Sequence, residues 1–172
     1  MKTPICSFDA RTGTLCTRCE AKLNSGHISE ADIEGAIRLT KLAEREQEVN
    51  KFTMVSGSKV DDDFILSLRG SDIIFLRANP SIITKIEDEF QSKVWLIEAE
   101  ANDKRFIENL FFPLRVLAIN LVWLPDGNKL TRVVIAGSNK SRSTTQITKI
   151  QKITSMIKNI ELLVEFESIG ND

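Results

Sequence analysis

Apolar positions in the middle of the chain change from a helical to a strand-like spacing. Between Asn102 and Pro113 the apolar residues fall on one helical face, and Pro113 ends this helix because its ring removes a backbone donor. Residues 116–124 then form an apolar run that closes on the turn signal Pro-Asp-Gly at 125–127. The pattern predicts a helix that leads directly into a strand, and a turn back into a second strand.

A similar order of strand, loop, helix and strand occurs on each side of this stretch. The predicted strands cover 64–68 and 93–99 in the first unit and 130–136 and 160–166 in the second. An amphipathic helix starts at Pro80, and another covers 144–158 with isoleucines at helical spacing. Two small sheets, each with helices on one face, fit this length. We therefore predict an α/β (α+β) fold, divided into residues 1–28, 29–101 and 102–172.

The residues before the first repeat predict one further helix and a short strand. Ser29 is a good N-cap, and the helix after it is expected to run to about Glu48. Residues 51–55 follow as a strand candidate, and the Gly57-Ser58 pair is expected to form a turn.

Composition favours a globular cytoplasmic protein. Of the 172 residues, 42% are hydrophobic and 27% charged, which excludes disordered and fibrous classes. The chain has no apolar run long enough to cross a bilayer, and its first residues lack the apolar core of a signal peptide. We expect no membrane contact, and cysteines that act as thiols or metal ligands rather than as a disulfide framework.

Cysteine spacing predicts a zinc site within a short, zinc-ribbon-like N-terminal element. Cys16-x-x-Cys19 offers two thiolates from one tight turn, and Cys6 supplies a third. Structural zinc takes four ligands, so the fourth is His27, the only histidine, or Asp9. The alternatives are unliganded thiols or a bond between Cys6 and another cysteine. The predicted ligands are Cys6, Cys16, Cys19 and His27.

Positive charge is concentrated in the second unit, although the whole chain has a formal net charge of −1. Residues 129–158 contain seven basic residues and no Asp or Glu. These residues are Lys129, Arg132, Lys140, Arg142, Lys149, Lys152 and Lys158. Such a window suits the neutralisation of phosphates, and the alternative is a solvated basic face.

Signals for catalysis are weak. The sequence lacks Gly-x-Ser-x-Gly, a P-loop and His-Glu-x-x-His. Asp61, Asp62 and Asp63 could chelate a divalent ion, but their position before a strand favours a solvated turn. A metal-dependent enzyme would need more acidic or histidine ligands than this chain clusters, so we expect no enzyme.

Four aromatic residues are expected to fill hydrophobic cores. They are Trp95, Trp123, Phe111 and Phe112. The Phe111-Phe112 pair lies next to Pro113 and could also clamp the two modules together.

The central stretch carries a family resemblance. Its pattern is formed by Phe106, Ile107, Asn109, Leu110, Pro113 and Val116. With the N-terminal sequence CSFDARTGTLCTRCEAKL, the chain resembles archaeal NusA-like proteins that have tandem KH domains and a Cys-containing N-terminal extension. The resemblance covers residues 50–167 by pattern. It implies type II KH modules, RNA binding and a role in transcription elongation or termination.

The loops that clamp RNA in that family differ here. KH modules use Gly-x-x-Gly, whereas this chain has Arg-Ala-Asn-Pro at 77–80 and Gly-Ser-Asn-Lys-Ser-Arg at 137–142. The second loop suits a phosphate contact near a helix start, and the alternative is a solvated loop with an N-cap. The predicted RNA-binding residues are Lys129, Arg132, Lys140, Arg142, Lys149, Lys152 and Arg77.

Two functions follow as expectations. The first is non-catalytic RNA binding in transcription or its termination. The second is a protein-interaction adaptor on RNA polymerase or the ribosome, which has lost RNA clamping and docks through the N-terminal cysteine element and the apolar linker.

Overall fold

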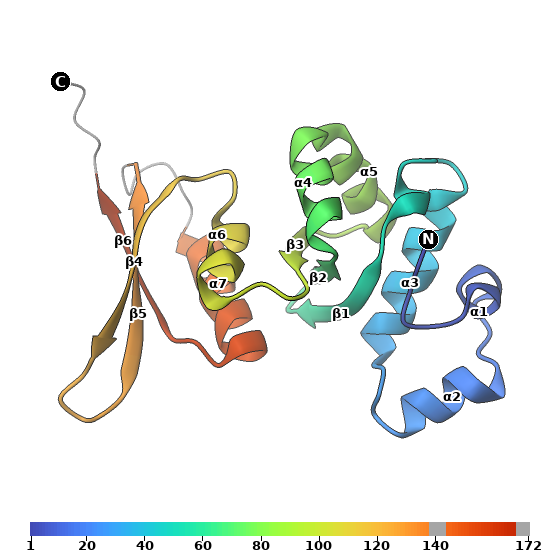
Figure 1. Cartoon of the computed structure of the whole chain (residues 1–172), viewed down its shortest axis with the longest axis horizontal. Helices are drawn as coiled ribbons and strands as arrows, with labels where there is room; N and C mark the ends of the chain where they lie inside the picture. The colour runs from blue at the N-terminus through green and yellow to red at the C-terminus, as the bar shows by residue number, and fades with distance from the viewer. Residues whose placement is uncertain (138–143, 168–172) are drawn as a thin grey trace. The chain divides into compact units, whose positions relative to one another are not determined.

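The computed structural model describes residues 1–137 and 144–167. The chain divides into two compact units, Met1–Ala101 and Asn102–Asp172. Each unit holds one three-stranded sheet with helices packed on it (Figure 1). The predicted α+β class with two small sheets is therefore confirmed, and the arrangement is consistent with two KH-like modules.

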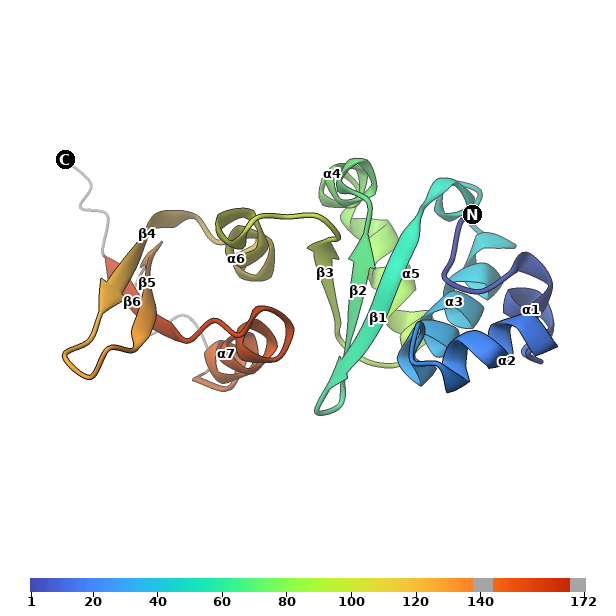
Figure 2. The same cartoon turned by 60° about the horizontal axis from the view of Figure 1, so that its bottom comes forward.

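The first unit contains most of the helices. Its elements are α1 (Ser7–Thr12), α2 (Thr17–Asn24), α3 (Glu30–Ala43), the 3-10 helix η1 (Val49–Lys51), β1 (Met54–Val60), β2 (Asp63–Leu68), α4 (Gly70–Ala78), α5 (Pro80–Phe90) and β3 (Val94–Glu98). The strand order is β1-β2-β3, with β2 antiparallel to β1 and parallel to β3. Helices α3 and α5 pack on the sheet (Figure 2).

A capping box starts α3 and also ties it to the sheet. Ser29 Oγ accepts from the Asp32 amide at 3.1 Å, and Asp32 Oδ2 accepts from the Ser29 amide at 2.7 Å. Asp32 Oδ1 accepts from the Gly57 amide of β1 at 2.6 Å. The helix ends at Ala43, before the predicted Glu48, and a turn segment at 44–48 leads from it to η1.

The predicted turn at Gly57-Ser58 is wrong, because both residues lie inside β1. Gly57 is required for close packing rather than for chain reversal. A Cβ at this position would lie 2.7 Å from the carbonyl oxygen of Ala31 in α3. The glycine therefore allows the backbones of α3 and β1 to approach each other.

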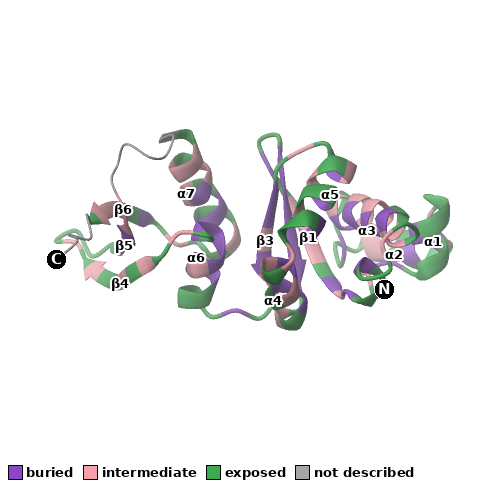
Figure 3. Ribbon diagram, turned by 90° about the horizontal axis from the view of Figure 1, so that it is seen from above, coloured by how far each residue is buried: buried purple, intermediate pink, exposed green. Residues whose placement is uncertain are grey.

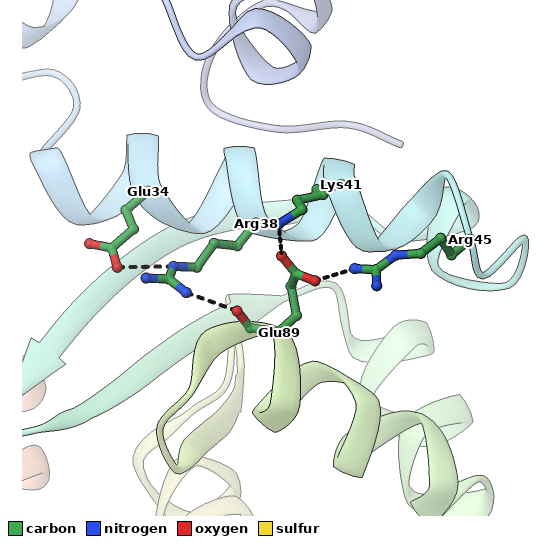
Figure 4. A network of polar contacts seen from close by, with 5 residues as sticks. All are labelled: Glu34, Arg38, Lys41, Arg45 and Glu89. Atoms are coloured by element: carbon green, nitrogen blue, oxygen red, sulfur yellow. Dashed lines mark hydrogen bonds and ion pairs between the residues drawn. The ribbon is translucent and has the colours of Figure 1, made fainter.

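An ion-pair network joins α3 to α5 (Figure 4). The Glu89 carboxylate accepts from Arg45 and lies 3.2 Å from Lys41 Nζ. Arg38 donates to the Glu89 carbonyl oxygen at 2.8 Å. Arg38 and Lys41 of α3 and Arg45, just after the helix, thus hold the C-terminal turn of α5 against α3.

Residues 1–28 form two short helices, α1 and α2, where a ribbon-like element was predicted. They contribute Ile5, Ala10 and Cys19 to the buried core that also contains Leu39 of α3. Lys2 forms a parallel bridge with Thr53, next to the start of β1. The N-terminal element is therefore packed into the first unit.

The second unit repeats the strand pattern of the first. Its described elements are α6 (Asp103–Phe111), β4 (Val116–Trp123), β5 (Lys129–Ala136), α7 (Thr144–Lys158) and β6 (Leu162–Glu167). Strand β5 is antiparallel to β4 and parallel to β6. Figure 3 shows α6 and α7 on one side of this sheet. Asn102 caps α6, accepting from the Arg105 amide at 2.9 Å, and the helix ends before Pro113 as predicted.

The aromatic residues divide into buried and exposed pairs. Trp95 and Phe111 are buried, as predicted. Trp123 and Phe112 are exposed, so the prediction that they fill cores is wrong. Trp123 is the last residue of β4, beside the β4–β5 turn, and Phe112 follows the end of α6. Within the described part of the chain, no helix has both the length and the apolar character needed to cross a bilayer.

Candidate metal centre and candidate nucleic-acid interface

Four potential metal ligands converge where α1 and α2 begin. One ligand atom from each of Cys6, Asp9, Cys16 and Cys19 lies within 4.8 Å of all the others. Asp9 and Cys19 are buried, Cys16 is half-buried and Cys6 is exposed. The structure therefore brings together the three predicted cysteines, with a carboxylate as the fourth member.

Both helices present their ligands in the same way. Cys6 is the N-cap of α1 and Cys16 is the N-cap of α2, and the second ligand of each helix comes three residues later. The backbone amide of Asp9 donates to Cys6 Sγ at 3.5 Å, and the amide of Cys6 donates to Cys19 Sγ at 3.5 Å. The two N–H···S contacts fix the positions of Cys6 Sγ and Cys19 Sγ relative to the backbone.

The carboxylate and the thiols shift each other's ionisation. The pKa of Asp9 is lowered to about 2, chiefly by the neighbouring Cys19 thiol and then by the Cys16 amide. The pKa of Cys19 is raised to about 12, chiefly by the Asp9 carboxylate. The Asp9 carboxylate therefore opposes the ionisation of the Cys19 thiol. A bound cation would remove this opposition, because it stabilises carboxylate and thiolate together.

The residues fit a divalent metal ion. Asp9 Oδ2 accepts from the Cys16 amide at 3.0 Å. Asp9 Oδ1 is buried and has no hydrogen-bond partner among the described residues, and a buried oxygen of this kind calls for a ligand. Three thiols and a carboxylate oxygen form a complete set of zinc-type donors.

His27 lies outside this group. Its ring Nδ1 is 2.7 Å from the hydroxyl of Ser25, in the exposed turn after α2. The described residues that could together hold a metal include Asp9 and not His27. The fourth position in the structure is thus occupied by the other candidate from the sequence.

The acidic run at residues 61–63 forms part of a strand connection. Asp61 and Asp62 are exposed in the turn between β1 and β2. Asp63 is buried and accepts from the indole nitrogen of Trp95 at 2.9 Å. The structure thus uses Asp63 to position an aromatic side chain.

The predicted RNA-binding residues of β5 have partners in the sheet. Lys129 Nζ lies 4.5 Å from the centre of the Trp123 ring. Arg132 Nη2 lies 2.5 Å from Glu165 Oε2 on the neighbouring strand β6. This ion pair raises the pKa of Arg132 and lowers the pKa of Glu165. The structure places both basic residues in the second unit, and Arg132 already has a counter-charge.

The other predicted RNA-binding residues are distributed over both units. Lys149 and Lys152 are three residues apart on α7, half-buried and exposed respectively, and so neighbour each other on the helix. Lys140 and Arg142, with the loop after Gly137, lie outside the described residues. Arg77 is in the last turn of α4, in the first unit.

The loop predicted at 77–80 is short in the structure. Asn79 alone separates α4 from α5, and Pro80 occupies the first position of α5. The Asn79 side chain donates to the Phe75 carbonyl oxygen at 2.9 Å. This junction is closed by its own hydrogen bonds.

Two site residues were underestimated from sequence. Asp9 has a detectable signal, because Cys6-x-x-Asp9 has the same spacing as Cys16-x-x-Cys19. Trp123 has none, since an aromatic residue in an apolar strand pattern predicts burial.

No family model matches the chain, and no curated protein matches it. Among solved structures, the crystal structure of APE1850 is similar, with a TM-score of 0.47 and 12% sequence identity. The match covers 76% of this chain and 95% of that chain.

Proposed function

We propose that this chain is a non-catalytic RNA-binding protein, related in role to NusA-type factors of transcription elongation and termination. The observation that carries the proposal is the acid-free stretch 129–158, with seven basic residues on a small α+β unit. Clustered Lys and Arg without acids neutralise phosphates and release counterions. The internal repeat of the sheet pattern supports the same reading, because KH-like modules occur in tandem in the family that the sequence resembles.

Phosphate contacts in the second unit are assigned to lysine side chains of α7, beside the basic residues at the start of β5. Lys149 and Lys152 share one side of the helix, so both can contact the same stretch of an RNA backbone. We therefore assign RNA contacts to Lys149 and Lys152, together with Lys140 and Arg142 from the sequence.

Zinc is the proposed metal at the start of α1 and α2. Cysteine thiolates favour zinc over magnesium or calcium, and one carboxylate oxygen is an accepted zinc ligand. Four protein donors leave no position for a substrate, so the role is structural. The ion would join helices of six and eight residues, which are too short to be stable by themselves.

RNA binding tests the proposal directly. Gel shifts with single-stranded and with structured RNA near physiological salt would compare the wild type with the double variant Lys149→Glu/Lys152→Glu. A matched control, Lys51→Glu/Lys104→Glu, makes the same charge change at exposed lysines outside the stretch. We expect binding by the wild type and the control and at least about tenfold weaker binding by the α7 variant. A wild type that binds neither RNA would overturn the proposal and favour the adaptor.

A further inference from the structure

The β4–β5 hairpin presents a large aromatic side chain to solvent. Trp123 is 63% exposed, and Leu121, two residues earlier on the same strand, is 57% exposed. Residues two apart on a strand point to the same face, so the two side chains form one apolar strip. Trp95, the only other tryptophan, is 5% exposed and hydrogen-bonded to Asp63.

The strip continues the face that forms the core of the unit. Trp123 pairs directly with Lys129, and Ile119 pairs with Val133, so all four lie on one side of the sheet. Val133 is fully buried. Exposure therefore rises along this face toward the hairpin turn.

A cation lies against the aromatic ring. Lys129 Nζ is 4.5 Å from the ring centre of Trp123, which is within the range of a cation–π contact. The one acid of the turn, Asp126, is engaged by Asn128, whose backbone and side-chain nitrogens lie 3.0 and 2.9 Å from its carboxylate oxygens. Lys129, whose ammonium group lies against the indole, is also the first residue of the acid-free stretch 129–158.

We propose that Trp123 is a stacking site for an unpaired base of single-stranded RNA, with Leu121 beside it and Lys129 as the phosphate contact. This inference rests on the proposed function and adds the form of RNA that this surface takes. An exposed indole beside an ammonium group combines the two contacts by which proteins hold single strands, aromatic stacking and neutralisation of the backbone. The lysine favours a polyanion over an apolar peptide as the occupant of the strip.

Tryptophan fluorescence tests this site. The full-length protein is titrated with an oligouridylate of about ten nucleotides, and with the same strand in a duplex. The single strand is expected to quench the emission of the wild type, and the quenching is expected to disappear in Trp123→Phe because the buried Trp95 does not respond. Affinity measured by fluorescence anisotropy of labelled RNA should fall about tenfold in Trp123→Ala and much less in Trp123→Phe, which keeps a ring.

A matched control distinguishes the strip from the rest of the sheet. Leu163 is 42% exposed and pairs with Arg132, on the opposite face from Trp123. Leu163→Ala should bind RNA like the wild type. Equal affinities of Trp123→Ala and wild type for the single strand would overturn the stacking site while leaving RNA binding in place. A wild type that binds neither single-stranded nor duplex RNA would instead show that the proposed function itself is wrong.

Discussion

Asp9 Oδ2 accepts a hydrogen bond from the backbone amide of Cys16 at 3.0 Å, so the first turn of α1 is joined to the start of α2. The second oxygen of the same carboxylate is buried without a hydrogen-bond partner among the described residues, beside three thiols. One oxygen therefore positions the two helices, and the other is available to a metal ion. This division of roles makes Asp9 the residue on which the metal assignment depends.

Substitution of Asp9 should weaken zinc binding. Structural zinc sites bind with roughly 10–16 kcal/mol shared by four ligands, so Asp9→Ala is expected to lower the affinity by about two orders of magnitude. Competition with a chromophoric chelator measures this loss. His27→Ala is the matched control and should leave the affinity unchanged. A loss in His27→Ala with none in Asp9→Ala would restore the ligand set predicted from sequence.

Metal removal should loosen α1 and α2 before the rest of the chain. The amides of Ala10 and Glu20 donate to the carbonyl oxygens of Cys6 and Cys16 inside these short helices. After chelation we expect faster hydrogen exchange at both amides, because neither helix is long enough to be stable without the metal ion that joins α1 to α2. The amide of Thr131, which donates to Glu161 in the second unit, is the internal control. Unchanged exchange at Ala10 and Glu20 would exclude a structural metal.

Gly57→Ala should destabilise the first unit. The added methyl group would lie 2.7 Å from the Ala31 carbonyl oxygen, and a backbone atom cannot easily move away. The expected loss is about 1–3 kcal/mol in the free energy of unfolding, measured with urea. Gly70→Ala is the comparison variant, because the atoms nearest to its methyl group would belong to the Glu98 side chain rather than to the backbone. It should cost less stability than Gly57→Ala, because a side chain can move away where a backbone carbonyl cannot. Equal effects of both variants would contradict the close contact of α3 with β1.

The contribution of the Arg132–Glu165 ion pair should depend on pH. Arg132 lowers the pKa of Glu165 below its ordinary 4.5. The ionised Glu165 therefore stabilises the folded state at pH values above its ordinary pKa. This stabilisation disappears as the pH falls through the lowered pKa of the folded state. Arg132→Gln should therefore reduce the urea midpoint of the second unit at neutral pH, and the difference from wild type should vanish in acid. A difference that persists unchanged into acid would show that the arginine stabilises by packing alone.

Local sequence signals correctly predicted where several helices begin. Ser29 and Pro80 lie at helix starts where capping and proline chemistry place them, because these effects act within one turn. Gly57 was misread because its role depends on Ala31, on another element, and such an approach leaves no trace in neighbouring residues.

The candidate site was predicted in part for the same reason. Cys6, Cys16 and Cys19 are brought together as their spacing indicates. The choice between Asp9 and His27 required the relative placement of α1 and α2, which sequence spacing does not define. The exposure of Trp123 depends on how far the helices cover the sheet, and an apolar strand pattern cannot show where that cover ends.

The salt dependence of RNA binding tests the central claim most directly. Each phosphate contact to a single strand contributes a slope of about −0.7 to the plot of log affinity against log salt. The wild type should show a clearly negative slope, and Lys149→Glu/Lys152→Glu should reduce its magnitude by at least about 1.4 units, while Lys51→Glu/Lys104→Glu leaves it unchanged. Identical slopes for the wild type and the α7 variant would contradict the assignment of RNA binding to the basic second unit.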